Sequence, residues 1–189
     1  MMEFLRTRRT YRRFEQRPVA PELLTEAVEA ARIASCGNNR QTLKYMIVQS
    51  PAMVAAAQPL VHWAASLPPE QGCPKPGEQP VAFIAVLQDE RLPGGSDTDV
   101  GLAMGSMTAA AWAHGVGSCL MGSIDRPALT QLLGLPEGVK LRYMVAFGYP
   151  SHQSHLVTAV DGNVKYYLDD ARDYCVPKRP LEEVLLKTL

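Results

Sequence analysis

The chain lacks an excess of charge of either sign. Its 189 residues include 19 Lys and Arg and 19 Asp and Glu, so the formal net charge is zero. A protein without net charge presents no strong overall field to nucleic acid or to a membrane surface. Any affinity for an anion must therefore come from a local group of basic residues.

Cysteine is scarce, and its spacing fits neither a disulfide scaffold nor a metal finger. The four residues, Cys36, Cys73, Cys119 and Cys175, include no C-x-x-C pair. So few cysteines in a chain of this length are more typical of free thiols in a reducing compartment. We therefore expect a cytoplasmic protein, with Cys119 as a small buried hydrophobic residue rather than a nucleophile.

A clear export or membrane segment is also missing. The basic N-terminus is not followed by the apolar stretch of a secretory signal. Residues 100–124 carry no formal charge and are long enough to cross a bilayer. However, Gly115, Gly117 and Gly122 interrupt the pattern, so we interpret it as a buried helix over residues 99–114, a glycine break and a buried strand.

The apolar patterns predict one domain over residues 1–189 of the α+β class, with three layers in the order α/β/α. Short runs that are apolar throughout are typical of a sheet covered on both faces. No G-x-G-x-x-G follows a strand, so a Rossmann dinucleotide site has no support. Residues 67–80 are expected to form a surface loop. The other expected elements are helices over residues 21–34, 126–133 and 181–189 and strands over residues 45–49, 81–87, 143–149 and 164–168.

Four arginines stand within residues 8–14, R-R-T-Y-R-R-F. In a helix, Arg8 would lie over Arg12 and Arg9 over Arg13, and each like-charge pair would destabilise the helix by roughly 0.2–0.5 kcal/mol. A solvated helical face and an arm for nucleic acid are two alternatives. A bound phosphate is a third, because each charge-assisted hydrogen bond to it contributes about 1.5–3 kcal/mol.

A single mononucleotide phosphate fits this cluster better than nucleic acid does. The basic residues beyond position 17 are scattered, whereas a nucleic-acid surface needs a wider basic stripe with interleaved aromatic residues. Thr10 adds a hydroxyl donor among the arginines. The planar guanidinium group also matches the geometry of phosphate oxygens.

The motif resembles R-R-S-x-R-x-F, which opens the FMN-dependent nitroreductase family, with Thr10 at the serine position. Four further blocks are similar to that family's motifs and occur in the same order. They are ASCGNNRQTLKYMIV from Ala34, DVGLAMGSMTAAAWAHGVGSCLMGSID from Asp99, LLGLPEGVKLRYMVAFGYP from Leu132 and VPKRPLEEVL from Val176. Together the five blocks cover nearly the whole chain.

The resemblance implies a nitroreductase-like fold. Such a fold has a central mixed, mainly antiparallel sheet, a long buried helix and an intertwined homodimer. It further implies two FMN sites at the subunit interface, each built from both chains.

The resemblance also implies roles for the basic residues. Arg8 and Thr10 would hold the FMN phosphate, and Lys178 or Arg179 would close the phosphate site. Arg9 would line the ribityl chain and the pyrimidine.

Arg12 would lie by N1 and O2 of the flavin ring, where negative charge develops on reduction. Asn39 and Gln41 would meet the polar edge of the pyrimidine, because each side chain offers donors and acceptors. Cys36 would contribute its backbone.

The backbone at Met121 and Gly122 would approach flavin N5. No acid or base side chain is assigned, because the flavin carries the hydride.

The implied reaction is a ping-pong hydride transfer from NADH or NADPH through FMN to a nitroaromatic or related small oxidised acceptor. A flavin, quinone or enone reductase of the same family is the alternative. A non-enzymatic nucleotide or nucleic-acid binding protein is the alternative from another class. We expect a homodimer without a nucleic-acid or membrane partner.

Two histidine motifs remain outside this scheme. His152 and His155 form an H-x-x-H pair, but no further ligands stand at a recognisable spacing, so an exposed loop is favoured over a metal site. His62 and Trp63 either are ordinary helix residues or line the acceptor channel, and we rank the structural interpretation higher.

Overall fold

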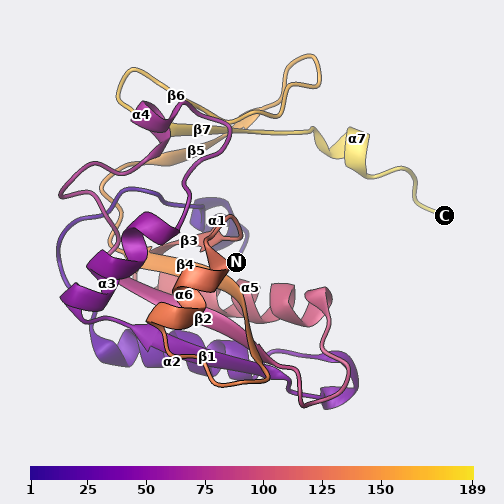
Figure 1. Ribbon diagram of the computed structural model, residues 1–189. Helices are drawn as coiled ribbons and strands as arrows, with labels where there is room; N and C mark the ends of the chain where they lie inside the picture. Colours follow the sequence, from indigo (N-terminus) through magenta and orange to yellow (C-terminus); the bar gives the residue numbers. More distant parts are fainter.

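The computed structural model describes residues 1–189 and contains seven α-helices and seven β-strands (Figure 1). The helices are α1 (Met2–Thr7), α2 (Pro21–Arg32), α3 (Pro51–Ala57), α4 (Pro69–Gly72), α5 (Asp97–Ala113), α6 (Arg126–Leu132) and α7 (Leu181–Val184). The strands are β1 (Leu43–Val48), β2 (Ala82–Asp89), β3 (Gly117–Met121), β4 (Val139–Gly148), β5 (Ser154–Thr158), β6 (Tyr167–Leu168) and β7 (Tyr174–Lys178).

The central sheet has the strand order β1-β2-β4-β3, and its three strand pairings are all antiparallel. A parallel bridge between Thr10 and Ser118 adds the N-terminal segment beside β3. The sheet is thus mixed but mainly antiparallel, as the resemblance implies.

Alternate residues of β2 point into two separate cores, because side chains in a strand alternate between faces. Phe83, Ala85 and Leu87 pack with α3 and α6 on one face. Ala82, Ile84 and Val86 pack with α2 and α5 on the other face. This arrangement confirms the three-layer α/β/α architecture and places β2 and β4 at its centre.

The edge strand β1 departs from the prediction that the apolar strands are covered on both faces. Lys44 and Ile47 are exposed, and Val48 is the one residue of β1 that is buried. The reason is its place at the end of the strand order, where helices cover the sheet less completely.

Local signals placed α2 and α6 correctly. Pro21 begins α2, where its missing N–H needs no partner, and Leu24 and Ala27 are buried. In α6 the Asp125 side chain accepts a hydrogen bond from Ala128 N (3.0 Å). Gly134, with φ +61°, follows the end of that helix.

Helix α5 is buried on one side only, which corrects the prediction of a fully buried helix. Met104 and Met107 point into the core, whereas Leu102 is 47% exposed. A Cβ added at Gly101 or Gly105 would meet no atom within 4 Å. Within one chain, the opposite face of this small and apolar helix therefore has no partner. No helix in the structure combines the length and the apolar character needed to cross a membrane.

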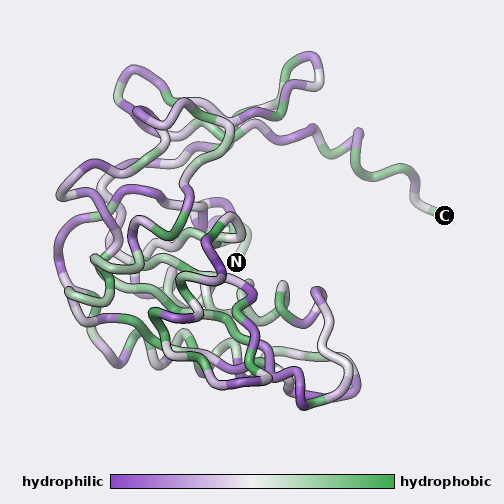
Figure 2. Tube along the Cα trace, in the orientation of Figure 1, coloured by the Kyte–Doolittle hydropathy of each residue, from purple (hydrophilic) through white to green (hydrophobic).

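The C-terminal part of the chain forms a second sheet with the order β5-β7-β6, in which β5 and β7 are parallel. The strand expected over residues 164–168 is limited to Tyr167 and Leu168. The helix expected over residues 181–189 is a single short turn, because it packs on nothing that would stabilise it. The tail leaves the body and carries hydrophobic stretches (Figures 1 and 2), with Leu186 93% exposed.

Candidate functional site

The segment containing the four arginines is extended, so the premise that it is helical is wrong. Helix α1 ends at Thr7. Beyond it, Tyr11 N donates to Ser118 O (2.9 Å) and Phe14 N donates to Glu78 O (2.9 Å). The extended path buries the Tyr11 and Phe14 side chains in the core, and that burial outweighs the helix propensity of the arginines.

The guanidinium groups of Arg8 and Arg9 lie half-buried beside α5 rather than on a solvated face. Arg8 Nη1 donates to Thr108 Oγ1 of α5 (2.8 Å). The Nε atoms of both arginines are buried without a hydrogen-bond partner. Burial, and next the charge of Arg8, lower the pKa of the Arg9 guanidinium.

The other two arginines of the cluster have different surroundings. Arg12 lies over the rings of Tyr166 and Tyr174, with its Cζ atom 4.6 and 4.7 Å from their centroids. Arg13 is only 5% exposed and donates to Arg172 O. Arg13 therefore supports the fold, whereas Arg12 keeps its charge unpaired.

Arg8, Arg9 and Arg12 form no ion pair with a carboxylate. Six other arginines of the chain do, namely Arg17, Arg32, Arg91, Arg142, Arg172 and Arg179. Buried donors without partners are unfavourable, and charged ones especially so. The three groups therefore fit an anion with several acceptor oxygens, such as a phosphate ester.

The predicted contacts at Met121 and Gly122 lie at the end of β3, the strand that the arginine segment joins. Met121 is buried in the core. A Cβ at Gly122 would lie 3.0 Å from Cε1 of Tyr143, so glycine gives a close approach that a larger residue would reach only if the Tyr143 ring shifted. Arg126 Nη2 donates to Gly122 O (3.0 Å) and to Arg142 O (3.2 Å), which fixes the backbone at this point.

The loop with Cys36, Asn39 and Gln41 follows α2 and has an unusual backbone. Asn39 and Gln41 have φ values of +53° and +49° in the left-handed region, which most residues avoid. Gly37 N donates to Oδ1 of the buried Asp99 of α5 (2.8 Å). A pocket of about 280 Å³ brings Cys36 and Gln41 together with Asp99.

Within one chain, the predicted site residues fall into separate groups. The loop touches α5 at Asp99, whereas Arg8 touches it at Thr108. Asp99 and Thr108 are nine residues apart, which corresponds to about 13 Å along the helix. One chain therefore places the loop and Arg8 at different ends of α5.

Lys178 and Arg179 lie at the end of β7, in the second sheet. Strand β5, the parallel partner of β7, contacts α1. Arg179 pairs with Glu183 (3.1 Å), whereas Lys178 forms no ion pair.

The two histidines of the H-x-x-H motif are not placed as a pair. His152 is buried, which corrects the expected exposed loop, and His155 alone is exposed. The His152 ring packs against those of Tyr11 and Tyr174, at centroid distances of 5.4 and 5.1 Å. His155 instead lies near Asp169 and Asp173, and their potential ligand atoms are within 4.8 Å of one another.

The buried His152 should make the protein sensitive to acid. Burial, and next the charge of Arg13, lower its pKa from 6.5 to about 4. Because the unfolded state binds this proton more readily, stability is lost as the pH falls from about 6.5 to 4. We expect this residue to contribute roughly 3 kcal/mol to the loss.

Urea unfolding of the parent and of His152→Gln at pH 7 and pH 4.5 measures this effect. The variant should lose less stability than the parent between the two pH values. An equal loss in both proteins would contradict the assignment.

The structure also settles the packing of three other residues. His62 and Trp63 lie outside any helix, which corrects the interpretation as helix residues. Trp63 is buried in the core, and His62 is exposed with its backbone N–H donating to Ser123 O (3.0 Å). Cys119 is buried, and burial raises the pKa of its thiol to about 11. It is thus a small hydrophobic residue, as predicted.

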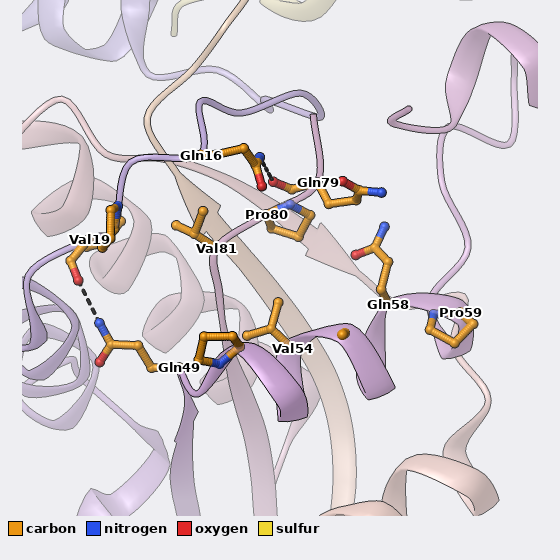
Figure 3. Close-up of a pocket in the computed structure, with 12 residues that line it drawn as sticks. Gln16, Val19, Gln49, Val54, Gln58, Pro59, Gln79, Pro80 and Val81 are labelled. Atoms are coloured by element: carbon orange, nitrogen blue, oxygen red, sulfur yellow. Dashed lines mark hydrogen bonds between the residues drawn. The ribbon is translucent and has the colours of Figure 1, made fainter. Parts of the chain in front are cut away.

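A cavity of about 770 Å³ is lined by none of the predicted site residues (Figure 3). It has no Arg, Lys or His in its lining. Gln49 Nε2 donates to Val19 O (2.6 Å) and Gln16 Nε2 donates to Gln79 O (3.0 Å) across its wall. A cavity without a cation does not suit a phosphorylated ligand.

Sequence reasoning missed several residues that shape the arginine site. Thr108 accepts a hydrogen bond from Arg8, and Arg126 donates one to the Gly122 carbonyl. The rings of Tyr166 and Tyr174 lie under Arg12. Thr108 lies inside a recognised motif. For the tyrosines, no local pattern indicates a contact with the other end of the chain.

Comparison with known proteins gives a consistent match. The sequence model of the Nitroreductase family matches residues 5–149. A protein of Archaeoglobus fulgidus, whose name joins NADH dehydrogenase and NAD(P)H nitroreductase, is 25% identical over 168 residues. That alignment covers 85% of this chain and 91% of the relative.

Two solved structures share the fold. A Desulfovibrio desulfuricans protein in complex with FMN has a TM-score of 0.70 and 18% identity. The aligned region covers 100% of this chain and 96% of the Desulfovibrio chain. An FMN-dependent nitroreductase of Clostridium difficile has a TM-score of 0.66 and 17% identity. The aligned region covers 90% of this chain and 99% of the Clostridium chain.

Proposed function

The chain belongs to the nitroreductase family, and from this premise we propose that it is an FMN-dependent NAD(P)H oxidoreductase. Its substrates would be nitroaromatic or related small oxidised acceptors. The observation that carries the proposal is the trio of half-buried arginines, Arg8, Arg9 and Arg12, none of which pairs with a carboxylate. The Nε atoms of Arg8 and Arg9 are also buried without a hydrogen-bond partner. The chemistry that bound FMN supplies is hydride acceptance from NADH or NADPH and delivery to the acceptor.

Arg8, Arg9, Thr10 and Arg12 would each hold one part of the cofactor, whereas Arg13 supports the fold. Arg8, oriented by Thr108, and Thr10 hold the phosphate. Arg9 lines the ribityl chain and the pyrimidine. Lys178 is better placed than Arg179 to close the phosphate site, because Arg179 already pairs with Glu183.

Arg12 would hold the ring part of the cofactor, where its positive charge would stabilise the negative charge that develops on reduction. The backbone at Met121 and Gly122 would contact the flavin ring, and Arg126 keeps that backbone in one orientation by donating to Gly122 O.

A homodimer would complete the site. Cys36, Asn39 and Gln41 lie on a loop at the other end of α5 from Arg8. A second copy with its α5 antiparallel to the first would bring its own loop to the arginines, and a two-fold axis would form two equal sites. The open face of α5, with Leu102 exposed, and the exposed leucines of the tail, such as Leu186, support this assembly.

The four cysteines are all free, which suits a reducing compartment such as the cytoplasm. We therefore place the enzyme there.

Anaerobic spectroscopy tests the function. We expect the protein to bind FMN and turn yellow, to be bleached by NADH or NADPH, and to regain its colour with a nitroaromatic acceptor. Comparison with quinone and enone acceptors distinguishes the related reductases. A protein that stays colourless after reconstitution with FMN would contradict the proposal.

A further inference from the structure

Arg12 is held by two aromatic rings rather than by an acid. Its Cζ atom lies 4.6 Å from the Tyr166 centroid and 4.7 Å from the Tyr174 centroid. The two rings are 6.0 Å apart and tilted by 48°, so the guanidinium group rests over both at once. Both contacts are within the range of a cation–π interaction.

The two rings form a rigid platform. Tyr174 begins β7, is 1% exposed and packs against His152 (5.1 Å between centroids). Tyr166 packs against the hydrophobic core, and its hydroxyl oxygen accepts a hydrogen bond from Ser66 N (3.4 Å). Pairing of Leu168 with Tyr174 in the second sheet keeps the segment of Tyr166 beside β7.

The nature of the support matters for the charge of Arg12. A carboxylate would also restrain this long side chain, but it would neutralise the charge and occupy the N–H donors. An aromatic face attracts the cation through its quadrupole and leaves the edge of the guanidinium group free to donate. The two rings thus hold the Arg12 guanidinium group in place without neutralising its positive charge.

We propose that Tyr166 and Tyr174 are positioning residues that hold the Arg12 guanidinium so that it stabilises the reduced flavin more than the oxidised flavin. This inference rests on the proposed FMN site. It adds two residues, from the far end of the sequence, that tune the reduction potential without touching the cofactor.

The test is the midpoint potential of bound FMN, together with the FMN dissociation constant, in single and double variants. Tyr166→Leu should weaken binding of reduced relative to oxidised FMN about tenfold. For a two-electron couple, that corresponds to a potential about 30 mV more negative. Tyr166→Phe keeps the ring and should leave the potential unchanged, as should Tyr167→Leu, whose side chain is exposed on β6.

Arg12→Gln should lower the potential at least as much as Tyr166→Leu does. Adding Tyr166→Leu to Arg12→Gln should then have no further effect, because the ring acts through the guanidinium group. The inference is overturned if the parent binds FMN and Tyr166→Leu leaves the potential unchanged. It is also overturned if Tyr166→Leu lowers the potential equally in the Arg12→Gln background. Failure of the parent to bind FMN would instead refute the proposed function.

Discussion

Replacing Arg8 with alanine should weaken FMN binding by roughly 10- to 100-fold, the loss expected for one charge-assisted hydrogen bond of about 1.5–3 kcal/mol. Arg8 is the arginine that α5 orients directly, through Thr108 Oγ1 (2.8 Å). Its Nε atom is buried without a partner. Apart from the hydrogen bond to Thr108, no side-chain hydrogen bond or ion pair of Arg8 within the chain is lost with the side chain.

The fold should survive this substitution. The Thr108 hydroxyl also donates to Gly105 O (3.2 Å), so it keeps a partner when Arg8 is absent. Arg6→Ala is the matched control, because Arg6 is exposed in the last turn of α1, next to the cluster. Fluorescence titration should show near-parental FMN affinity for Arg6→Ala, and equal affinities for all three proteins would contradict the role of Arg8.

Gly105→Arg should prevent formation of the proposed homodimer and so give a monomer that no longer retains FMN. The space around Gly105 is open within one chain, and replacing a helical glycine does not lower helix propensity. In a dimer that packs this face against a second copy, the arginine would be a buried and unpaired charge. Such a charge is unfavourable by about 3–5 kcal/mol, or roughly a hundredfold or more in association.

Light scattering during size-exclusion chromatography measures the assembly, and thermal unfolding checks the fold. Thr25→Arg is the control, because Thr25 lies exposed on α2 and the substitution adds the same charge to a different helix face. It should remain dimeric and yellow. A Gly105→Arg protein that is still dimeric with FMN bound would show that α5 does not form the interface.

The sequence was informative where local chemistry decides structure. Pro21 and Gly134 marked helix limits, and the apolar runs marked β2 and β4. The arginine motif identified the group of cations that lacks acidic partners.

Elsewhere, tertiary packing decided against the local pattern. The arginine segment is extended because Tyr11 and Phe14 are buried in the core. His152 is buried because it fills a gap between Tyr11 and Tyr174. Contacts such as Arg12 with Tyr166 join opposite ends of the chain, and no short-range spacing in the sequence encodes them.

The α5 face shows a third kind of difference. Its residues are apolar all round, which predicts burial on every side, yet one chain buries only half of the helix. The composition of α5 is consistent with an assembly of two chains. For such a helix, the sequence pattern predicts that the apolar residues are buried. It does not tell whether the same chain or a second chain covers them.

The central claim is that Arg8 and its neighbours hold a phosphate group, and comparison of FMN with riboflavin tests it most directly. Riboflavin has the same ring and ribityl chain but no phosphate. Titrations of the parent and of Arg8→Ala with both ligands should show strong preference for FMN in the parent and a preference at least tenfold smaller in the variant. A preference for FMN that is absent from the parent, or unchanged by Arg8→Ala, would contradict the account.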